Sequence, residues 1–90
     1  MNSANWILRN DGRDIDCVSF PFAFRTMFNT VRKGIADKKP VDTKKMTILG
    51  PRNLRGDRRT YSYEAATTLA LDQGLLDANG QIDNRAFKKK

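Results

Sequence analysis

The residues best suited to bind a ligand are the basic residues in the middle of the chain. Four arginines share a short segment rich in Gly and Asn, and four lysines precede them. A guanidinium group can donate two parallel hydrogen bonds to phosphate or carboxylate oxygens. The pattern therefore predicts a phosphate-binding surface. Its expected residues are Arg52, Arg55, Arg58 and Arg59, extended by Lys38, Lys39, Lys44 and Lys45.

The net charge of +7 arises entirely in this part of the chain. Between positions 32 and 59 there are ten basic and three acidic residues, whereas the rest of the chain holds seven of each. Such an asymmetry affects partners and association rates rather than the fold. We therefore expect nucleic acid as the partner, with an acidic protein surface as the alternative.

The side chains that most often perform catalysis are scarce. The chain has no His and a single Cys, which removes the commonest general base and excludes a zinc site of the Cys/His type. Asp14 and Asp16 lie two apart on a predicted strand, but without a cavity or a metal we expect them to be solvated. No phosphate-binding glycine loop or nucleophile elbow is present. We expect a non-enzymatic protein with no catalytic residues, cofactor or metal.

One segment near the C-terminus resembles part of a calcium-binding loop. Asp77, Asn79 and Gly80 match the third, fifth and sixth positions of an EF-hand loop. The first and twelfth positions, however, are Leu75 and Ala86, where the site requires carboxylates. We therefore expect a tight turn here and no calcium.

Three further features are expected to be structural. Arg55-Gly56-Asp57 spells an adhesion tripeptide, but three residues recur by chance and suit a turn. Cys17 has no evident neighbour that would stabilise a thiolate, so we expect a small buried residue. The aromatic run after it is expected in the core, although an exposed Phe20 or Phe22 would anchor a partner protein.

The elements that position these residues begin with a hairpin. Residues 6–9 and 14–20 are predicted strands, joined by Asn10-Asp11-Gly12-Arg13, because Asp-Gly favours a tight hairpin turn. Ile15 and Cys17 are expected to share one face of the second strand, with Asp14 on the other.

Two helices are predicted, at residues 21–33 and 63–73. Ser19 can cap the first, and Gly34 is expected to end it in the left-handed conformation. Ser62 is a good cap for the second, and Gly74 repeats the end pattern. Apolar residues on one face of the first helix are Phe24, Met27, Phe28, Val31 and Ile35.

A second hairpin is predicted between the helices. Residues 46–49 form its first strand, Gly50-Pro51 ends that strand, and 52–58 is a loop before a return strand at 59–61. The order β-β-α-β-β-α predicts an α+β fold in which two helices pack on one face of a small antiparallel sheet. Residues 85–90 are predicted to be a basic C-terminal tail.

The length of 90 residues indicates one small domain covering 1–90. A single cysteine favours a reducing compartment, no apolar run is long enough to span a membrane, and the N-terminus lacks a secretory pattern. We therefore expect a cytoplasmic protein, with no membrane contact, that acts as a nucleic-acid-binding or regulatory protein. The alternative is a protein-interaction module, such as a small inhibitor or adaptor.

Overall fold

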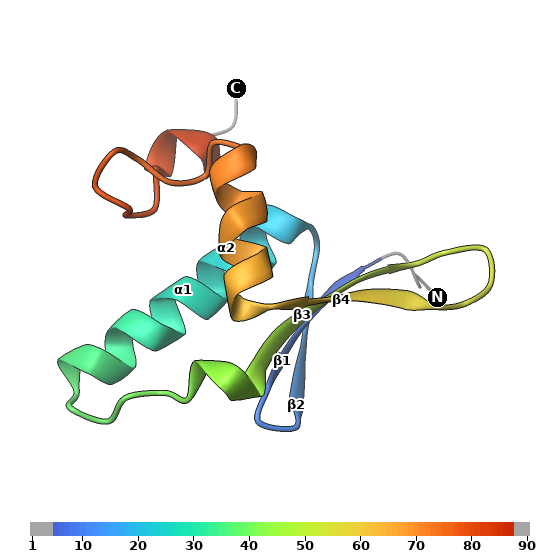
Figure 1. Ribbon diagram of the computed structural model, residues 1–90, viewed down its shortest axis with the longest axis horizontal. Helices are drawn as coiled ribbons and strands as arrows, with labels where there is room; N and C mark the ends of the chain where they lie inside the picture. The colour runs from blue at the N-terminus through green and yellow to red at the C-terminus, as the bar shows by residue number, and fades with distance from the viewer. Residues whose placement is uncertain (1–4, 88–90) are drawn as a thin grey trace.

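The computed structural model describes residues 5–87, which form one four-stranded antiparallel sheet and two α-helices (Figure 1). The strands are β1 (Trp6–Asn10), β2 (Arg13–Cys17), β3 (Met46–Arg52) and β4 (Arg58–Ser62). The helices are α1 (Phe20–Ala36) and α2 (Tyr63–Asp72), with short 3-10 helices η1 (Thr43–Lys45) and η2 (Asn84–Phe87). The sheet order is β2-β1-β3-β4. The predicted α+β fold and its element order are confirmed.

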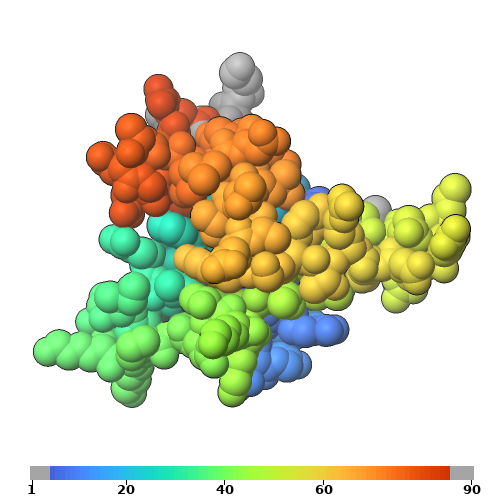
Figure 2. Space-filling view, in the orientation of Figure 1, coloured from blue at the N-terminus to red at the C-terminus, as the bar shows by residue number. Residues whose placement is uncertain are grey.

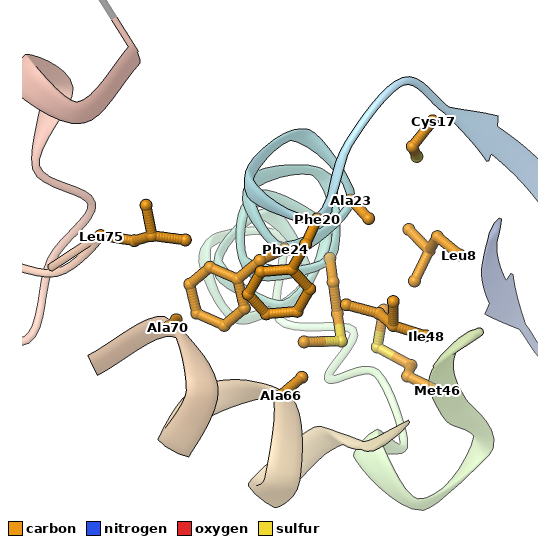
Figure 3. Packing of buried hydrophobic residues seen from close by; sticks show 11 residues of the cluster. Leu8, Cys17, Phe20, Ala23, Phe24, Met46, Ile48, Ala66, Ala70 and Leu75 are labelled. Carbon is orange, nitrogen blue, oxygen red and sulfur yellow. The ribbon is translucent and has the colours of Figure 1, made fainter. Parts of the chain in front are cut away.

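The core lies between the sheet and both helices (Figure 3). Leu8 and Ile48 alternate with more exposed neighbours along β1 and β3, so that they point toward Phe24 of α1 and Ala66 of α2. Burial of one such large apolar side chain contributes about 1.5–3 kcal/mol. The small alanines of α2 let that helix approach the sheet closely.

The β1–β2 hairpin turns where Asp11-Gly12 was predicted to turn. Both residues have positive φ, 52° and 86°, as a two-residue hairpin loop of type I′ requires. The predicted second strand is too long, because it ends at Cys17 and Phe20 already begins α1. Ile15 was expected to face the core with Cys17, yet it is 44% exposed because β2 is an edge strand.

The predicted end of α1 at Gly34 is wrong. The helix continues past this buried glycine, and Lys38 adopts the left-handed conformation with φ 60°. The N–H of Lys38 donates to the Ile35 carbonyl oxygen, and the N–H of Lys39 donates to that of Gly34, which is the Schellman arrangement. Ile35, expected on the core face, is 60% exposed.

The ends of α2 are as predicted. The Ser62 hydroxyl oxygen accepts a hydrogen bond from the N–H of Ala65 at 3.1 Å. Gly74 has φ 74°, and the N–H of Leu75 donates to the carbonyl oxygen of Ala70 at 2.9 Å. Leu75 is then buried against the core, which fixes the direction of the following segment.

Gly50-Pro51 does not end the third strand, contrary to the prediction. The β3–β4 register passes from Leu49 opposite Thr60 to Arg52 opposite Arg58, which leaves one extra residue in β3. This β-bulge accommodates proline, which has no N–H for the ladder. Consequently β3 and β4 continue as a longer hairpin than the sequence indicated.

Candidate nucleic-acid interface

The end of the β3–β4 hairpin projects from the rest of the molecule as a narrow arm (Figures 1 and 2). In Figure 2 it is the yellow and yellow-green extension that reaches away from the helices. We call residues 51–59 the distal hairpin. All of its residues are exposed except Arg58, which is partly buried. This arm presents side chains to a partner on several sides.

Hydrogen bonds within the loop hold the tip of the distal hairpin. The Asn53 side-chain oxygen accepts from the N–H of Arg55 at 2.8 Å and from the N–H of Asp57 at 3.1 Å. The N–H of Gly56, which has φ 87°, donates to the Asn53 carbonyl oxygen at 2.9 Å. Residues 54–56 form a three-residue hairpin loop. Asn immediately before such a loop and Gly at its last position, in the left-handed region, both suit it. The loop therefore keeps its shape without apolar packing.

Three of the predicted arginines are presented by this arm. Arg52, Arg55 and Arg59 are exposed, and the salt bridges found among residues 5–87 are formed by other cations, at Arg9, Lys33, Lys45 and Arg85. The Arg59 guanidinium lies 6.0 Å from the centre of the Tyr61 ring.

Arg58, the fourth arginine, contacts the protein backbone. One of its terminal nitrogens donates to the carbonyl oxygen of Asn5 at 2.8 Å and to that of Gly50 at 2.9 Å. These bonds tie the base of the distal hairpin to the start of β1 and to the bulge. Arg58 also stands directly opposite Arg52 in the ladder, and like charges in that position are destabilising. The charge of Arg52 is therefore not explained by stability of the fold.

The predicted lysines lie away from the arginines. Lys44 and Lys45 belong to η1, which precedes β3 and so lies at the end of that strand remote from the distal hairpin. The Lys45 ammonium is 3.9 Å from a carboxylate oxygen of Asp11. Lys38 and Lys39 follow α1, whose end is at the opposite side of Figure 1 from the hairpin. The structure thus brings the four arginines together and separates both lysine pairs from them.

The residues considered for chemistry are engaged elsewhere. Asp14 accepts two hydrogen bonds from the Arg9 guanidinium, at 2.8 and 3.1 Å, and these hold the pKa of its carboxyl below the usual range. Burial raises the pKa of the Cys17 thiol above its ordinary value, which opposes formation of a reactive thiolate. Across residues 5–87 no group of three or more Cys, Asp or Glu side chains is placed to hold a metal ion.

The calcium-like segment is a turn closed by its own aspartate. A carboxylate oxygen of Asp77 accepts from the N–H groups of Asn79 and Gln81, at 2.8 and 3.0 Å. Gly80 has φ 75°, and Leu76 forms an isolated bridge with Ile82. These bonds account for the residues that resemble the EF-hand loop.

Neither aromatic candidate for a partner anchor is exposed. Phe20 is 2% exposed and packs against Trp6 with ring centres 5.2 Å apart. Phe22 is partly buried, and the Arg25 guanidinium lies 5.3 Å from the centre of its ring. Phe20 therefore belongs to the core.

A shallow apolar hollow lies beside α2 and was not predicted from the sequence. It has a volume of about 670 Å³, and Leu71 at its edge is 58% exposed. The sign of it in the sequence is a large apolar residue, Leu71, directly after Ala70, which is buried in the core. The residues found to line it are Tyr61, Ala65, Thr68, Leu69, Leu71 and Asp72.

Comparison with known proteins adds no relative. No protein-family model matches the chain, and no match was found among curated proteins or solved structures. Within residues 5–87 neither helix has the length and apolar character needed to cross a bilayer.

Proposed function

We propose that this protein is a small non-enzymatic protein that binds nucleic acid through the distal hairpin. Arg52, Arg55 and Arg59 contact phosphate oxygens, and Arg58 braces the arm from which they extend. The observation that carries the proposal is that a projecting hairpin exposes three arginines, none of which is among the cations found in salt bridges within residues 5–87.

The shape of the arm favours nucleic acid over a flat acidic surface. The tip of a narrow arm of two hydrogen-bonded strands can lie in a groove of duplex DNA, with backbone phosphates on both sides of it. Guanidinium groups on opposite sides of the arm can then reach the phosphates that line the groove. A flat protein face would contact only one side of the same hairpin.

The separated lysines take a secondary role in this proposal. Lys38, Lys39, Lys44 and Lys45 raise the positive potential that attracts a polyanion from a distance. A short ligand held by the distal hairpin would not reach the end of α1, whereas a long one would be drawn toward it. Close contacts are therefore assigned to the arginines alone.

Affinity measured against salt concentration tests the proposal. Fluorescence anisotropy with labelled duplex DNA, duplex RNA and single strands would give the binding constant in each salt. If three arginines each neutralise one phosphate, the logarithm of the binding constant should fall against that of salt with a slope of about −3 on duplex DNA. Absence of binding to every probe at low salt, or a flat response, would overturn the proposal.

The hollow beside α2 favours a second candidate, a protein-interaction module that docks on an acidic face of a larger protein. Such a partner would contact the arginines and also fill the hollow at Leu71. Leu71→Asp would then weaken the protein complex while leaving nucleic-acid affinity nearly unchanged. If wild type and Leu71→Asp bind the partner protein with equal affinity, the hollow is not used in this way.

A further inference from the structure

Leu54 is the residue of the distal hairpin that phosphate contacts do not explain. It occupies the loop at the tip, between Arg52 and Arg55, and its relative exposure is 107%. It therefore contributes nothing to the core. A large apolar side chain fixed at the tip of a cationic arm has the chemistry of a wedge between stacked bases.

We propose that Leu54 inserts between adjacent base pairs of duplex DNA from the minor groove and kinks the helix. This rests on the proposed function, because the arginines must first hold the arm on the DNA. Apolar side chains that enter a base step in this way unstack it and bend the duplex toward the major groove. Insertion also opens the minor groove, which is otherwise only about 6 Å wide, to the rest of the tip.

The charges beside Leu54 suit this placement. Arg55 follows it in the loop, and Arg52 stands near the base of the same loop. Arginine side chains are attracted by the enhanced negative potential of a narrow minor groove. The two guanidinium groups would therefore contact the phosphates or base edges next to the step that Leu54 opens.

Rigidity of the tip is the second requirement for a wedge. Unstacking one base step costs a few kcal/mol, so a flexible loop would bend away from the DNA and would not separate the bases. The hydrogen bonds of Asn53 to Arg55 and Asp57 oppose that movement. Pro51 restricts the backbone of β3 below the loop because its ring fixes φ.

The placement of the aromatic residues argues against single strands as the ligand. Single-strand binding relies on bases stacking on exposed aromatic rings. Tyr61, on β4, packs instead against Trp6 and Phe20, with ring centres 5.9 and 6.2 Å apart. Duplex RNA is recognised mainly through its 2′-hydroxyls, for which leucine has neither donor nor acceptor. Duplex DNA remains the ligand that Leu54 suits.

The experiment measures bending and affinity separately on the full chain. A DNA duplex of about 30 base pairs carries a fluorophore at each end, so that energy transfer reports the bend, while anisotropy reports binding. The wild-type protein should bring the two ends closer together at saturation. Leu54→Ala should bind with an affinity within about tenfold of wild type and lose the bend, because burial of leucine and unstacking of the step oppose each other.

Matched variants identify the cause of a lost bend. Leu71→Ala makes the same substitution at another exposed leucine, on α2, and should bend DNA as wild type does. Leu54→Met keeps a large apolar side chain and should retain the bend. Because Leu54 makes no core contact, Leu54→Ala should unfold at the wild-type temperature.

The outcomes separate this inference from the proposed function. If the wild-type protein binds duplex DNA without bending it, or if Leu54→Ala bends it equally, the wedge is wrong and nucleic-acid binding stands. Binding to single strands or duplex RNA alone would also overturn the wedge. Failure to bind any nucleic acid, together with tight binding to an acidic protein that depends on Leu54, would overturn both proposals.

Discussion

Gly34 is buried at the place where the segment after α1 turns back against the helix. A Cβ at this position would lie 2.8 Å from the carbonyl oxygen of Lys39 and 3.0 Å from a methyl carbon of Val41. The first atom belongs to the backbone and cannot move alone. We therefore expect Gly34→Ala to lower the free energy of unfolding by about 1–3 kcal/mol, although alanine favours helices over glycine by about 1 kcal/mol.

Urea denaturation followed by far-UV circular dichroism would measure this change. Asn29→Ala is the control, because Asn29 is exposed on the same helix and alanine there should stabilise by a few tenths of a kcal/mol. A Gly34→Ala protein as stable as Asn29→Ala would show that the segment after α1 yields easily.

Cys17 should be protected while the protein is folded. It is 8% exposed, and burial raises the pKa of its thiol above the ordinary value. Only the thiolate reacts with an alkylating reagent. We expect iodoacetamide to modify the native protein slowly at neutral pH and the urea-unfolded protein rapidly, as mass spectrometry would record.

The raised pKa of Cys17 also predicts a pH dependence. The unfolded thiol ionises as pH rises through its ordinary pKa of about 8.5, whereas the folded one stays protonated. The stabilising contribution is therefore complete below that pH and is lost as pH rises toward the folded pKa. The difference in unfolding free energy between wild type and Cys17→Ala should shrink over this range, and a constant difference would contradict it.

At the scale of elements, a serine precedes each helix but caps only one of them. The Ser62 hydroxyl accepts from the N–H of Ala65, whereas the side chain of Ser19 makes no capping hydrogen bond, contrary to the prediction. Loss of an N-cap costs about 0.5–2 kcal/mol. We expect Ser62→Ala to lower the free energy of unfolding by about 1 kcal/mol and Ser19→Ala to change it little. Chemical denaturation of both variants measures this, and equal losses would contradict it.

The hairpins show which element boundaries a sequence can predict. The Asp11-Gly12 turn was predictable because positive φ at two successive residues is a local requirement. The prediction that Gly50-Pro51 ends the strand was wrong because proline ends a regular ladder but is tolerated at a β-bulge. Whether a bulge forms depends on the register with the partner strand. The extension of β3 that carries Arg52 beyond the body of the protein was therefore not predictable from local residues.

The two glycines at helix ends make the same distinction. Gly74 lies where the helix pattern stops, and it adopts the predicted left-handed conformation. Gly34 stands in the same sequence pattern, yet it serves the close approach of the segment containing Lys39 and Val41. Sequence spacing reports conformation near the residue. It does not report contacts with a segment that returns from elsewhere.

At the scale of the whole molecule, the fold class followed from hydrophobic periodicity and turn residues, whereas the shape of the charged surface did not. Ten basic residues lie within one window of the sequence. In the structure, however, the C-terminal end of α1 and the distal end of β3 lie on opposite sides of the molecule, so the basic residues near them are far apart. The four arginines stayed together because one hairpin carries them all. Whether the lysines lie beside these arginines depends on tertiary structure, and in this fold they do not.

That separation allows local contact to be distinguished from overall charge. Arg52, Arg55 and Arg59 changed together to Gln remove three positive charges from the distal hairpin, and Lys38, Lys39 and Lys44 changed to Gln remove three from elsewhere. If the distal hairpin makes the phosphate contacts, the arginine variant should lose nearly all of the salt dependence, at about 0.9 in slope per contact, whereas the lysine variant should keep most of it. All six residues are exposed, so both variants should melt near the wild-type temperature. Equal losses in the two variants would mean that the protein attracts nucleic acid through its total charge, without a defined interface.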